Sequence, residues 1–187
     1  MTRIVAGTAG GRRLRVPPSG TRPTSDRVRE ALFSALDARL DFAGARVLDL
    51  YAGSGALGLE ALSRGAEHAL LVESDRKAAA VVRGNIADLG LPGAELRVAT
   101  VACVLQQGGA GRFDVVFSDP PYAVDNVAVL ADLRALTERG WLRPGASVVL
   151  ERSARSPEIA WPAGFVSAKS RRYGETRIDL AEFEPDG

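Results

Sequence analysis

One short segment of this sequence combines residue types that could do chemistry: Asp119, Pro120, Pro121 and Tyr122. It follows an apolar run over 113–118 that is typical of a buried strand, and open α/β sheets bind their ligands at the carboxyl ends of strands. Each proline fixes φ and lacks an N–H, so carbonyl oxygens there are left free in a fixed direction. The segment therefore predicts a site that holds a planar, amine-bearing group by hydrogen bonds and stacking. The plainer alternative is a turn in which Tyr122 only packs.

A glycine-rich segment follows a second apolar strand, predicted over 46–50. Gly53, Gly55 and Gly58 form a G-x-G-x-x-G pattern, which is weak on its own because dinucleotide-binding folds and chance both produce it. Asp49 favours one class of ligand, because a carboxylate at the strand end repels a pyrophosphate but attracts an ammonium or a sulfonium. S-adenosylmethionine carries both of these cations, so the segment favours it as the cofactor.

A second acid, Glu73, ends the next predicted strand, over 69–73, and stands 18 residues after Gly55. A carboxylate at that place accepts hydrogen bonds from the two hydroxyls of a ribose. Dinucleotides and S-adenosylmethionine both contain a ribose. Glu73 therefore supports a nucleotide-binding fold more than it supports one particular cofactor.

Alternating strands and helices are expected to position these residues from residue 44 onward. The predicted strands span 46–50, 69–73, 96–99, 113–118 and 147–151. The predicted helices span 56–64, 75–89, 101–107 and 124–137. Short apolar strands that alternate with helices predict an α/β fold with a mainly parallel, doubly wound sheet. At the C-terminal end, segments 165–172 and 176–183 predict an antiparallel hairpin.

The first 20 residues predict a small β-hairpin outside the main domain, which would span residues 21–187. Two short segments, 3–6 and 13–16, flank three glycines and favour this hairpin. A helix is expected to follow.

That helix is expected to begin at Thr24 or Ser25, either of which is a good N-cap, with Asp26 in its first turn. Apolar residues recur at four-residue spacing from Val28 onward and predict one buried face. Arg27 lies on the opposite face and is free to point toward a site.

The net charge of +1 conceals an asymmetry along the chain. Residues 1–30 carry seven arginines and two acids, whereas the remaining chain carries 17 basic and 21 acidic side chains. A GC-rich genome explains why Arg outnumbers Lys by 22 to 2, but it does not explain the clustering. A basic arm on a mildly acidic body predicts contact with a polyanion. The candidate nucleic-acid contacts are Arg3, Arg12, Arg13, Arg15, Arg22, Thr24 and Arg27.

The composition of the 187-residue chain is that of one globular domain, with 46% hydrophobic residues. No apolar run is long enough for a membrane span, and no signal peptide is evident. A single cysteine, Cys103, favours a cytoplasmic location, and its apolar surroundings predict a buried, inert thiol. The only histidine, His68, has no potential metal ligand near it in the sequence.

The order and spacing of five features resemble the S-adenosylmethionine-dependent methyltransferases that modify exocyclic amines: Asp49, Gly53, Gly55, Glu73 and the segment 119–122. Two longer segments, 22–33 and 52–64, are similar to the bacterial small-subunit (16S) ribosomal RNA guanine-2-amino methyltransferases. The resemblance covers the chain from Arg3 to about Leu180.

This resemblance implies a Rossmann-like class I methyltransferase sheet, mostly parallel and seven-stranded, with a C-terminal antiparallel hairpin and a small N-terminal β-hairpin extension. It implies methylation of the exocyclic 2-amino group of a guanine in small-subunit ribosomal RNA, within a partly assembled ribosomal particle. The cofactor contacts would be Asp49, Ala52, Gly53, Gly55, Leu57, Glu73, Ser74, Thr100 and Asp119. Thr100 or a backbone carbonyl would replace the Asp or Asn that the family usually places after the third strand to meet the adenine.

The expected catalytic residues are Asp119, Pro120 and Tyr122. A guanine amino nitrogen is a poor nucleophile, because its lone pair is delocalised into the ring. The Asp119 side chain and the Pro120 carbonyl are expected to accept hydrogen bonds from its N–H groups. These hydrogen bonds favour the geometry that frees the lone pair. Tyr122 would stack on a base taken out of its helix. No metal or membrane is expected to take part.

Other functions fit the same motif. A DNA adenine or cytosine amino methyltransferase would share it, but such enzymes usually carry a larger target-reading domain than residues 1–30 provide. A glutamine-amide methyltransferase fits the basic arm less well. A non-catalytic RNA-binding assembly factor is the alternative outside the enzymes, and the intact acids and glycines argue against it.

Overall fold

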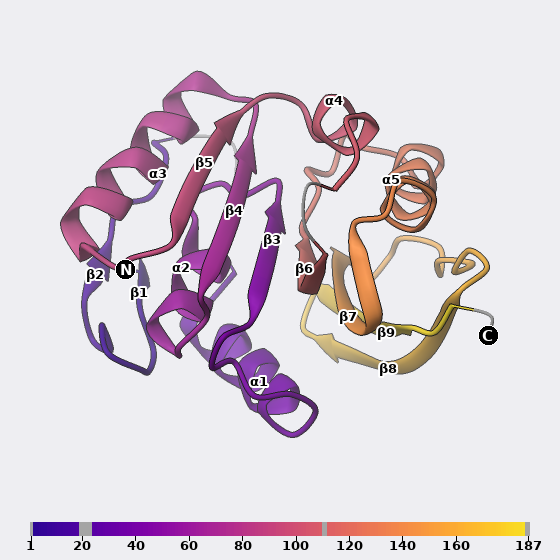
Figure 1. The fold of residues 1–187 in the computed structure, drawn as a ribbon, viewed down its shortest axis with the longest axis horizontal. Helices are drawn as coiled ribbons and strands as arrows, with labels where there is room; N and C mark the ends of the chain where they lie inside the picture. The colour runs from indigo at the N-terminus through magenta and orange to yellow at the C-terminus, as the bar shows by residue number, and fades with distance from the viewer. Residues whose placement is uncertain (1, 19–23, 110–111, 186–187) are drawn as a thin grey trace.

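A computed structural model describes residues 2–18, 24–109 and 112–185 of the chain. A seven-stranded sheet crosses it in the order β5-β4-β3-β6-β7-β9-β8 (Figure 1). The strands are β3 (Arg46–Leu50), β4 (His68–Glu73), β5 (Ala94–Val98), β6 (Phe113–Ser118), β7 (Leu142–Ser153), β8 (Phe165–Tyr173) and β9 (Thr176–Phe183). The first five are parallel, and β9 runs antiparallel to β7 and β8. The predicted mainly parallel sheet with a closing hairpin is confirmed.

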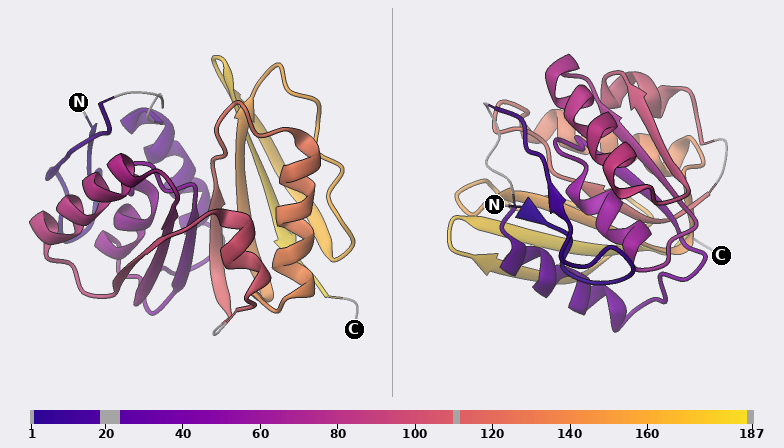
Figure 2. Two further views of the ribbon diagram at one scale, coloured as in Figure 1. Left: turned by 90° about the horizontal axis from the view of Figure 1, so that it is seen from above. Right: turned by 90° about the vertical axis from the view of Figure 1, so that its left-hand side faces the viewer.

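Helices cover both faces of the sheet (Figure 2). One face carries α1 (Asp26–Asp37), α2 (Ala56–Ser63) and α3 (Arg76–Leu89), and the other carries α4 (Val101–Gln106) and α5 (Asn126–Glu138). Each face has its own buried apolar cluster. Neighbouring residues of β6 alternate between them, so that Phe117 packs with the α1–α3 side and Val116 with the α4–α5 side. Burial on both faces explains why the strands are continuous apolar runs.

The strand order reverses between β3 and β6. The chain proceeds outward from β3 to β4 and β5 in one direction, and from β6 to β7 in the other. Such a switch point opens a crevice at the carboxyl ends of the two central strands, where ligands bind in doubly wound sheets. The predicted Asp49 and the segment 119–122 lie at these ends.

The predicted boundaries match these elements closely, with one larger difference in β7. The strand was expected to begin at residue 147, just after Pro144 and Gly145. In the structure it begins at Leu142, and its register with β6 shifts between the pairs at Phe113 and Val115. The irregularity accommodates the two residues that normally interrupt a strand.

The N-terminal hairpin, β1 (Thr2–Arg3) and β2 (Arg13–Leu14), is present but does not stand outside the main domain as expected. Ile4, Ala9 and Leu14 are buried in the same apolar cluster as α1, α2 and α3. These three residues recur every five positions, a spacing that fits neither the helix nor the strand period, so no periodic pattern indicated that they join the core.

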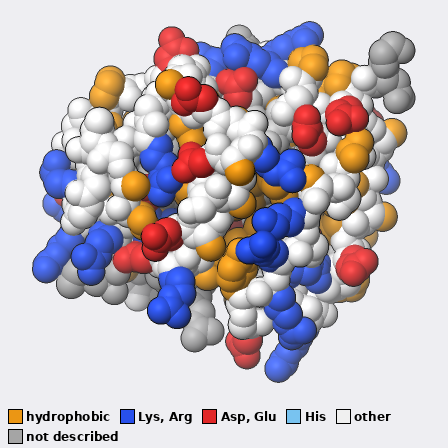
Figure 3. Space-filling model, turned by 90° about the horizontal axis from the view of Figure 1, so that it is seen from below, with side chains coloured by type: hydrophobic (Ala, Val, Ile, Leu, Met, Phe, Trp, Pro, Cys, Tyr) orange, Lys and Arg blue, Asp and Glu red, His pale blue; other side chains and the backbone are white. Residues whose placement is uncertain are grey.

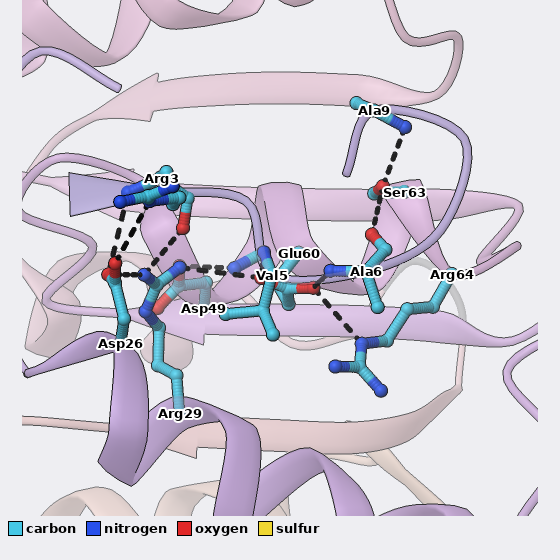
Figure 4. Close-up of polar contacts among 11 residues, drawn as sticks. Arg3, Val5, Ala6, Ala9, Asp26, Arg29, Asp49, Glu60, Ser63 and Arg64 are labelled. Carbon is cyan, nitrogen blue, oxygen red and sulfur yellow. Dashed lines mark hydrogen bonds and ion pairs between the residues drawn. The ribbon is translucent and has the colours of Figure 1, made fainter. Parts of the chain in front are cut away.

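The Glu60 carboxylate of α2 fastens the hairpin to the domain (Figure 4). Its oxygens accept hydrogen bonds from the backbone N–H groups of Val5 at 2.8 Å and Ala6 at 3.1 Å. The side chains of Arg29 and Arg64 form ion pairs with it at 3.4 and 3.0 Å. Glu60 and Arg29 are fully buried. One carboxylate therefore joins the hairpin, α1 and α2.

Arg29 has further partners in the same network. Its guanidinium donates to the Arg3 carbonyl oxygen at 2.6 Å and forms an ion pair with Asp26. The sequence places Arg29 among the basic residues of the arm, but in the structure it is a buried structural ion. Burial of a guanidinium requires such partners, because an unpaired buried charge is very costly.

Cys103 is exposed and not buried as its apolar segment suggested. The segment forms α4, and the helix period turns Val101, Val104 and Leu105 toward the sheet while Cys103 faces outward. Among the described residues, no helix is long and apolar enough to cross a membrane.

We predict that Glu60→Ala lowers the free energy of unfolding by about 3–5 kcal/mol, because it breaks the buried ion pair with Arg29 and leaves the N–H groups of Val5 and Ala6 without their acceptor. Urea denaturation measures this change. The control is Glu67→Ala, at an exposed position seven residues after Glu60. Its free energy of unfolding should stay within about 0.5 kcal/mol of the wild-type value. Equal stability of the two variants would show that the hairpin does not depend on this carboxylate.

Candidate active site

Four adjacent strands, β4, β3, β6 and β7, each present a carboxylate at the carboxyl end. These side chains are Glu73, Asp49, Asp119 and Glu151, in the order of the strands across the sheet. The sequence indicated the first three, and Glu151 ended a predicted strand without being recognised. The structure thus gathers four acids at the switch point of the sheet.

The register of the strands explains why these acids meet. Leu50 of β3 pairs with Val72 and with Ser118, and Ser118 pairs with Leu150. The residues that follow Val72, Ser118 and Leu150 are therefore level with one another, and Asp49 lies two residues before that level on β3. Leu71, Phe117 and Val149 lie two positions before Glu73, Asp119 and Glu151, and all three belong to the apolar cluster beneath α1–α3. By the two-residue alternation of strands, the carboxylates face this side.

Two adjoining cavities lie over this row of acids. The larger has a volume of about 800 Å³, which suits a cofactor-sized ligand. The smaller has a volume of about 60 Å³. Residues that line the larger include Gly53, Glu73, Ser74, Val101, Asp119 and Pro121. Residues that line the smaller include Thr24, Asp49, Ala52, Gly53, Leu57 and Asp119.

Two of the acids hold the glycine-rich loop in place. The Gly58 N–H donates to Asp49 Oδ2 at 2.9 Å, and the Gly53 N–H donates to Glu73 Oε1 at 2.8 Å. Gly53 and Gly55 have φ angles of 62° and 83°, which residues with a Cβ rarely adopt. Gly55 is also the N-cap of α2 and offers no side chain to the first-turn N–H groups. These N–H groups can donate hydrogen bonds to an anionic part of a ligand.

Burial raises the pKa of Asp49 to about 8. The Gly58 N–H partly opposes this rise, and the negative charge of Glu73 adds to it. Asp49 is only 2% exposed. Near neutral pH the free protein therefore keeps Asp49 mainly protonated, and a cation placed beside it would favour the ionised form.

Asp119 and Glu151 form a hydrogen-bonded pair of acids. Burial raises the pKa of Asp119 well above its ordinary value, and the charges of Glu151 and Asp49 raise it further. Burial also raises the pKa of Glu151, which the Thr24 hydroxyl opposes by donating to Oε2 at 2.8 Å. Two neighbouring carboxyls that cannot both ionise share one proton.

Tyr51 and Arg152 complete the surroundings of the site, and neither is among the predicted site residues. Tyr51 has a φ of 58°, unusual for a residue with a side chain, and lines both cavities. Its hydroxyl donates to Asp132 of α5. Arg152 is buried and donates to the Val124 carbonyl oxygen at 3.1 Å, just beyond the Pro-Pro segment. The sequence signalled neither residue, and nothing local predicts the backbone conformation of Tyr51.

The remaining predicted site residues are distributed unevenly. Pro120 is buried, whereas Tyr122 is 77% exposed and does not line either cavity. Thr100 is the N-cap of α4 and accepts the Cys103 N–H at 3.2 Å, and its neighbour Val101 lines the larger cavity instead.

The predicted nucleic-acid contacts also differ among themselves. Arg3 pairs with Asp26, and Arg15 pairs with Asp88. Thr24 bonds to Glu151 within the site. Arg12, Arg13 and Arg27 are exposed, as are Arg3 and Arg15, and Arg12 donates to the Asp88 carbonyl oxygen at 2.6 Å. Arg22 lies outside the described residues.

These features fit S-adenosylmethionine and do not fit a pyrophosphate. A row of carboxylates at the strand ends, two of them with strongly raised pKa values, favours a positively charged ligand. Glu73 retains lone pairs for ribose hydroxyls, since an ionised carboxylate has about four acceptor sites. No group of three or more His, Cys, Asp or Glu side chains in the described ranges is arranged to hold a metal ion.

Comparison with known proteins gives consistent matches along the chain. The family described as conserved hypothetical protein 95 matches residues 2–182. "Ribosomal RNA small subunit methyltransferase D" of Escherichia coli is 37% identical over 99% of this chain and 91% of its own length. The protein of that name in Haemophilus influenzae is 36% identical over 92% of this chain and 89% of its own length.

A solved structure has the same fold. It is titled "Putative methyltransferase yhhF from Escherichia coli", and it matches with a TM-score of 0.89 and 34% identity over 98% of each chain. The class I methyltransferase fold and the S-adenosylmethionine cofactor are confirmed. The chain belongs to the methyltransferase family described as conserved hypothetical protein 95.

Proposed function

We propose that this chain transfers a methyl group from S-adenosylmethionine to the exocyclic 2-amino group of a guanine in small-subunit ribosomal RNA. The observation that carries this proposal is Asp119, a partly buried acid at the switch point that opens into both cavities. The names of the relatives support ribosomal RNA as the substrate class. The Asp-Pro-Pro-Tyr segment supports an amine as the acceptor.

The cofactor part of the site would use the acids of β3 and β4. S-adenosylmethionine supplies an electrophilic methyl group carried on a sulfonium. Asp49 would face the cationic amino-acid part, and Glu73 would accept the ribose hydroxyls. Val72 and Val101 provide apolar lining in the larger cavity, suited to an adenine face. Thr100 has its hydroxyl engaged as a helix cap, so Val101 and backbone groups are better placed to meet the base.

The acceptor part of the site would use the Asp-Pro-Pro-Tyr segment. Asp119 and the Pro120 carbonyl would accept the two N–H bonds of the guanine amino group, and this favours the geometry that frees the nitrogen lone pair. Tyr122 is exposed and follows Pro121, which lines the larger cavity, so it can stack only on a base presented from outside. The guanine must therefore leave its own stack to reach Asp119. Holding the nitrogen in line with the methyl carbon lowers the remaining barrier.

The RNA would approach along the hairpin and the start of α1. Val16 and Pro17, which follow β2, line the smaller cavity, so the hairpin leads directly to the site. Arg12 and Arg13 are exposed on it. On the face seen from below, which includes α1, basic and acidic side chains are interspersed (Figure 3). A ribosomal particle that presents the guanine would place phosphates against particular arginines, such as Arg12 and Arg13.

Asp119→Ala tests the proposal most directly. We expect single-turnover methyl transfer to slow by about a hundredfold or more, because an acceptor for the reacting amine is lost. S-adenosylmethionine affinity should change by no more than a few-fold. The assay is methyl transfer to small-subunit ribosomal RNA or its assembly intermediates, followed by digestion and mass identification of the methylated nucleoside. A product other than 2-methylamino guanosine, or a wild-type rate in the variant, contradicts the proposal.

The same assay separates the alternatives. Methylation of DNA adenine or cytosine in place of RNA would indicate a DNA amino methyltransferase. Absence of S-adenosylmethionine binding by the wild type would indicate a non-catalytic assembly factor.

A second prediction concerns Asp49 and pH. A cation binds best to the ionised carboxylate, and the pKa of Asp49 in the free protein is about 8. Affinity for S-adenosylmethionine should therefore rise with pH between 6 and 7.5, by up to about tenfold per unit. Asn at position 49 can still accept the Gly58 N–H, so Asp49→Asn should keep the fold.

Calorimetry of wild type and Asp49→Asn over this pH range measures the effect. The variant should bind about ten- to a hundredfold more weakly at pH 7.5, the scale of a lost charged hydrogen bond, and with a much smaller dependence on pH. An identical pH dependence in both proteins would place the cationic group elsewhere.

A third prediction concerns the hairpin arginines. Arg12→Gln/Arg13→Gln should weaken RNA binding and reduce the slope of log affinity against log salt by about two, because each neutralised phosphate contributes about one. The control is Arg112→Gln/Arg139→Gln, two exposed arginines at the amino ends of the parallel strands, away from the site. If both double variants show the same slope as the wild type, the hairpin does not contact phosphates.

A further inference from the structure

Glu151 has no role in the mechanism described so far. It extends the row of acids onto β7, immediately beside Asp119. Its side chain is hydrogen-bonded to Asp119 on one side and accepts the Thr24 hydroxyl at 2.8 Å on the other. Thr24 precedes α1, more than a hundred residues away in the sequence. Two segments from opposite ends of the chain therefore converge on this acid.

The proposed reaction leaves one proton to be removed. The amino nitrogen begins with two N–H bonds, uses its lone pair to form the N–C bond as the C–S bond breaks toward sulfur, and ends with one N–H bond. One N–H electron pair returns to nitrogen, and its proton must reach a base. Asp119 is the nearest acid, but burial and its acidic neighbours hold a proton on it near neutral pH. It can accept a second proton only if it gives up the first.

We propose that Glu151 is a positioning residue that receives this proton through Asp119. The protonated Asp119 donates one carboxyl hydrogen to Glu151, which leaves its other oxygen to accept an N–H of the guanine amino group. As the amine proton moves to that oxygen, the shared hydrogen moves to Glu151. The pair changes from one negative charge to none, and no other reactant is required. This inference rests on the proposed amine methylation.

The charged groups around the pair support this direction of transfer. Thr24 donates to Glu151 and thereby stabilises its ionised form. Asp49 of β3 disfavours a negative charge on Asp119, whereas Arg152 of β7 favours one. From α1, Arg29 lines the same small cavity as Asp49 and Asp119. In the resting pair, therefore, Glu151 carries the charge and Asp119 the proton, as the transfer requires.

The test is single-turnover methyl transfer to RNA as a function of pH. Glu151→Gln should slow the reaction by about a hundredfold, the lower range for proton transfer by a positioned side chain. Its affinity for S-adenosylmethionine should match that of the wild type, because Glu151 lines neither cavity. Glu151→Asp should recover part of the rate, since it keeps a carboxylate.

Thr24→Val tests the relay through the pH dependence of the rate, which a merely structural role of Glu151 would not change. The wild-type rate should fall at low pH as Glu151 becomes protonated. Loss of the Thr24 hydrogen bond raises the pKa of Glu151, so this fall should move to higher pH by about one unit. Thermal unfolding verifies that each variant is folded. If Glu151→Gln does not fold, Glu151→Asp and Thr24→Val still test the proposal.

The outcomes separate the two proposals. If the wild type methylates guanine in RNA but Glu151→Gln retains its rate, or Thr24→Val retains its pH profile, the relay is contradicted and the proposed function stands. If the wild type methylates no RNA amine, the proposed function itself fails.

Discussion

The constraint on which this structure depends is the meeting of four carboxylates at the ends of four adjacent strands. Parallel register places Glu73, Asp119 and Glu151 level with one another, with Asp49 two residues before that level on β3. Repulsion and loss of water would make four full charges there costly. The protein avoids this cost through backbone N–H donors to Asp49 and Glu73, and through retained protons on Asp49 and Asp119. Such a site is suited to cations and N–H donors, and these are what a sulfonium cofactor and a guanine amine offer.

A second carboxylate network sets where the substrate side of the site lies. Glu60 joins the hairpin to α1 and α2 through Val5, Ala6 and Arg29. The start of α1 is thereby fixed where Thr24 can reach Glu151. The hairpin is thus part of the architecture that shapes the cavity, in addition to any contact it makes with RNA. Point substitutions of its exposed arginines consequently test RNA binding more cleanly than removal of the hairpin.

The sequence predicted the features that depend on residues close to one another along the chain. Apolar runs gave the strands, and strand-end acids with glycines indicated the side chains of β3 and β4. Features that depend on contacts between distant segments were missed, such as the burial of Ile4 and the pairing of Thr24 with Glu151. Cys103 was predicted to be buried but is exposed, because an apolar segment does not reveal which residues of a short helix face the sheet.

Mapping of modified nucleotides by mass spectrometry tests the central claim most directly. Small-subunit ribosomal RNA would be compared between cells that contain this protein and otherwise identical cells that lack it. The account predicts that one guanine carries a methyl group on its 2-amino nitrogen only when the protein is present. An unchanged set of guanine modifications, or the loss of a methyl group from a different base or a different RNA, would contradict it.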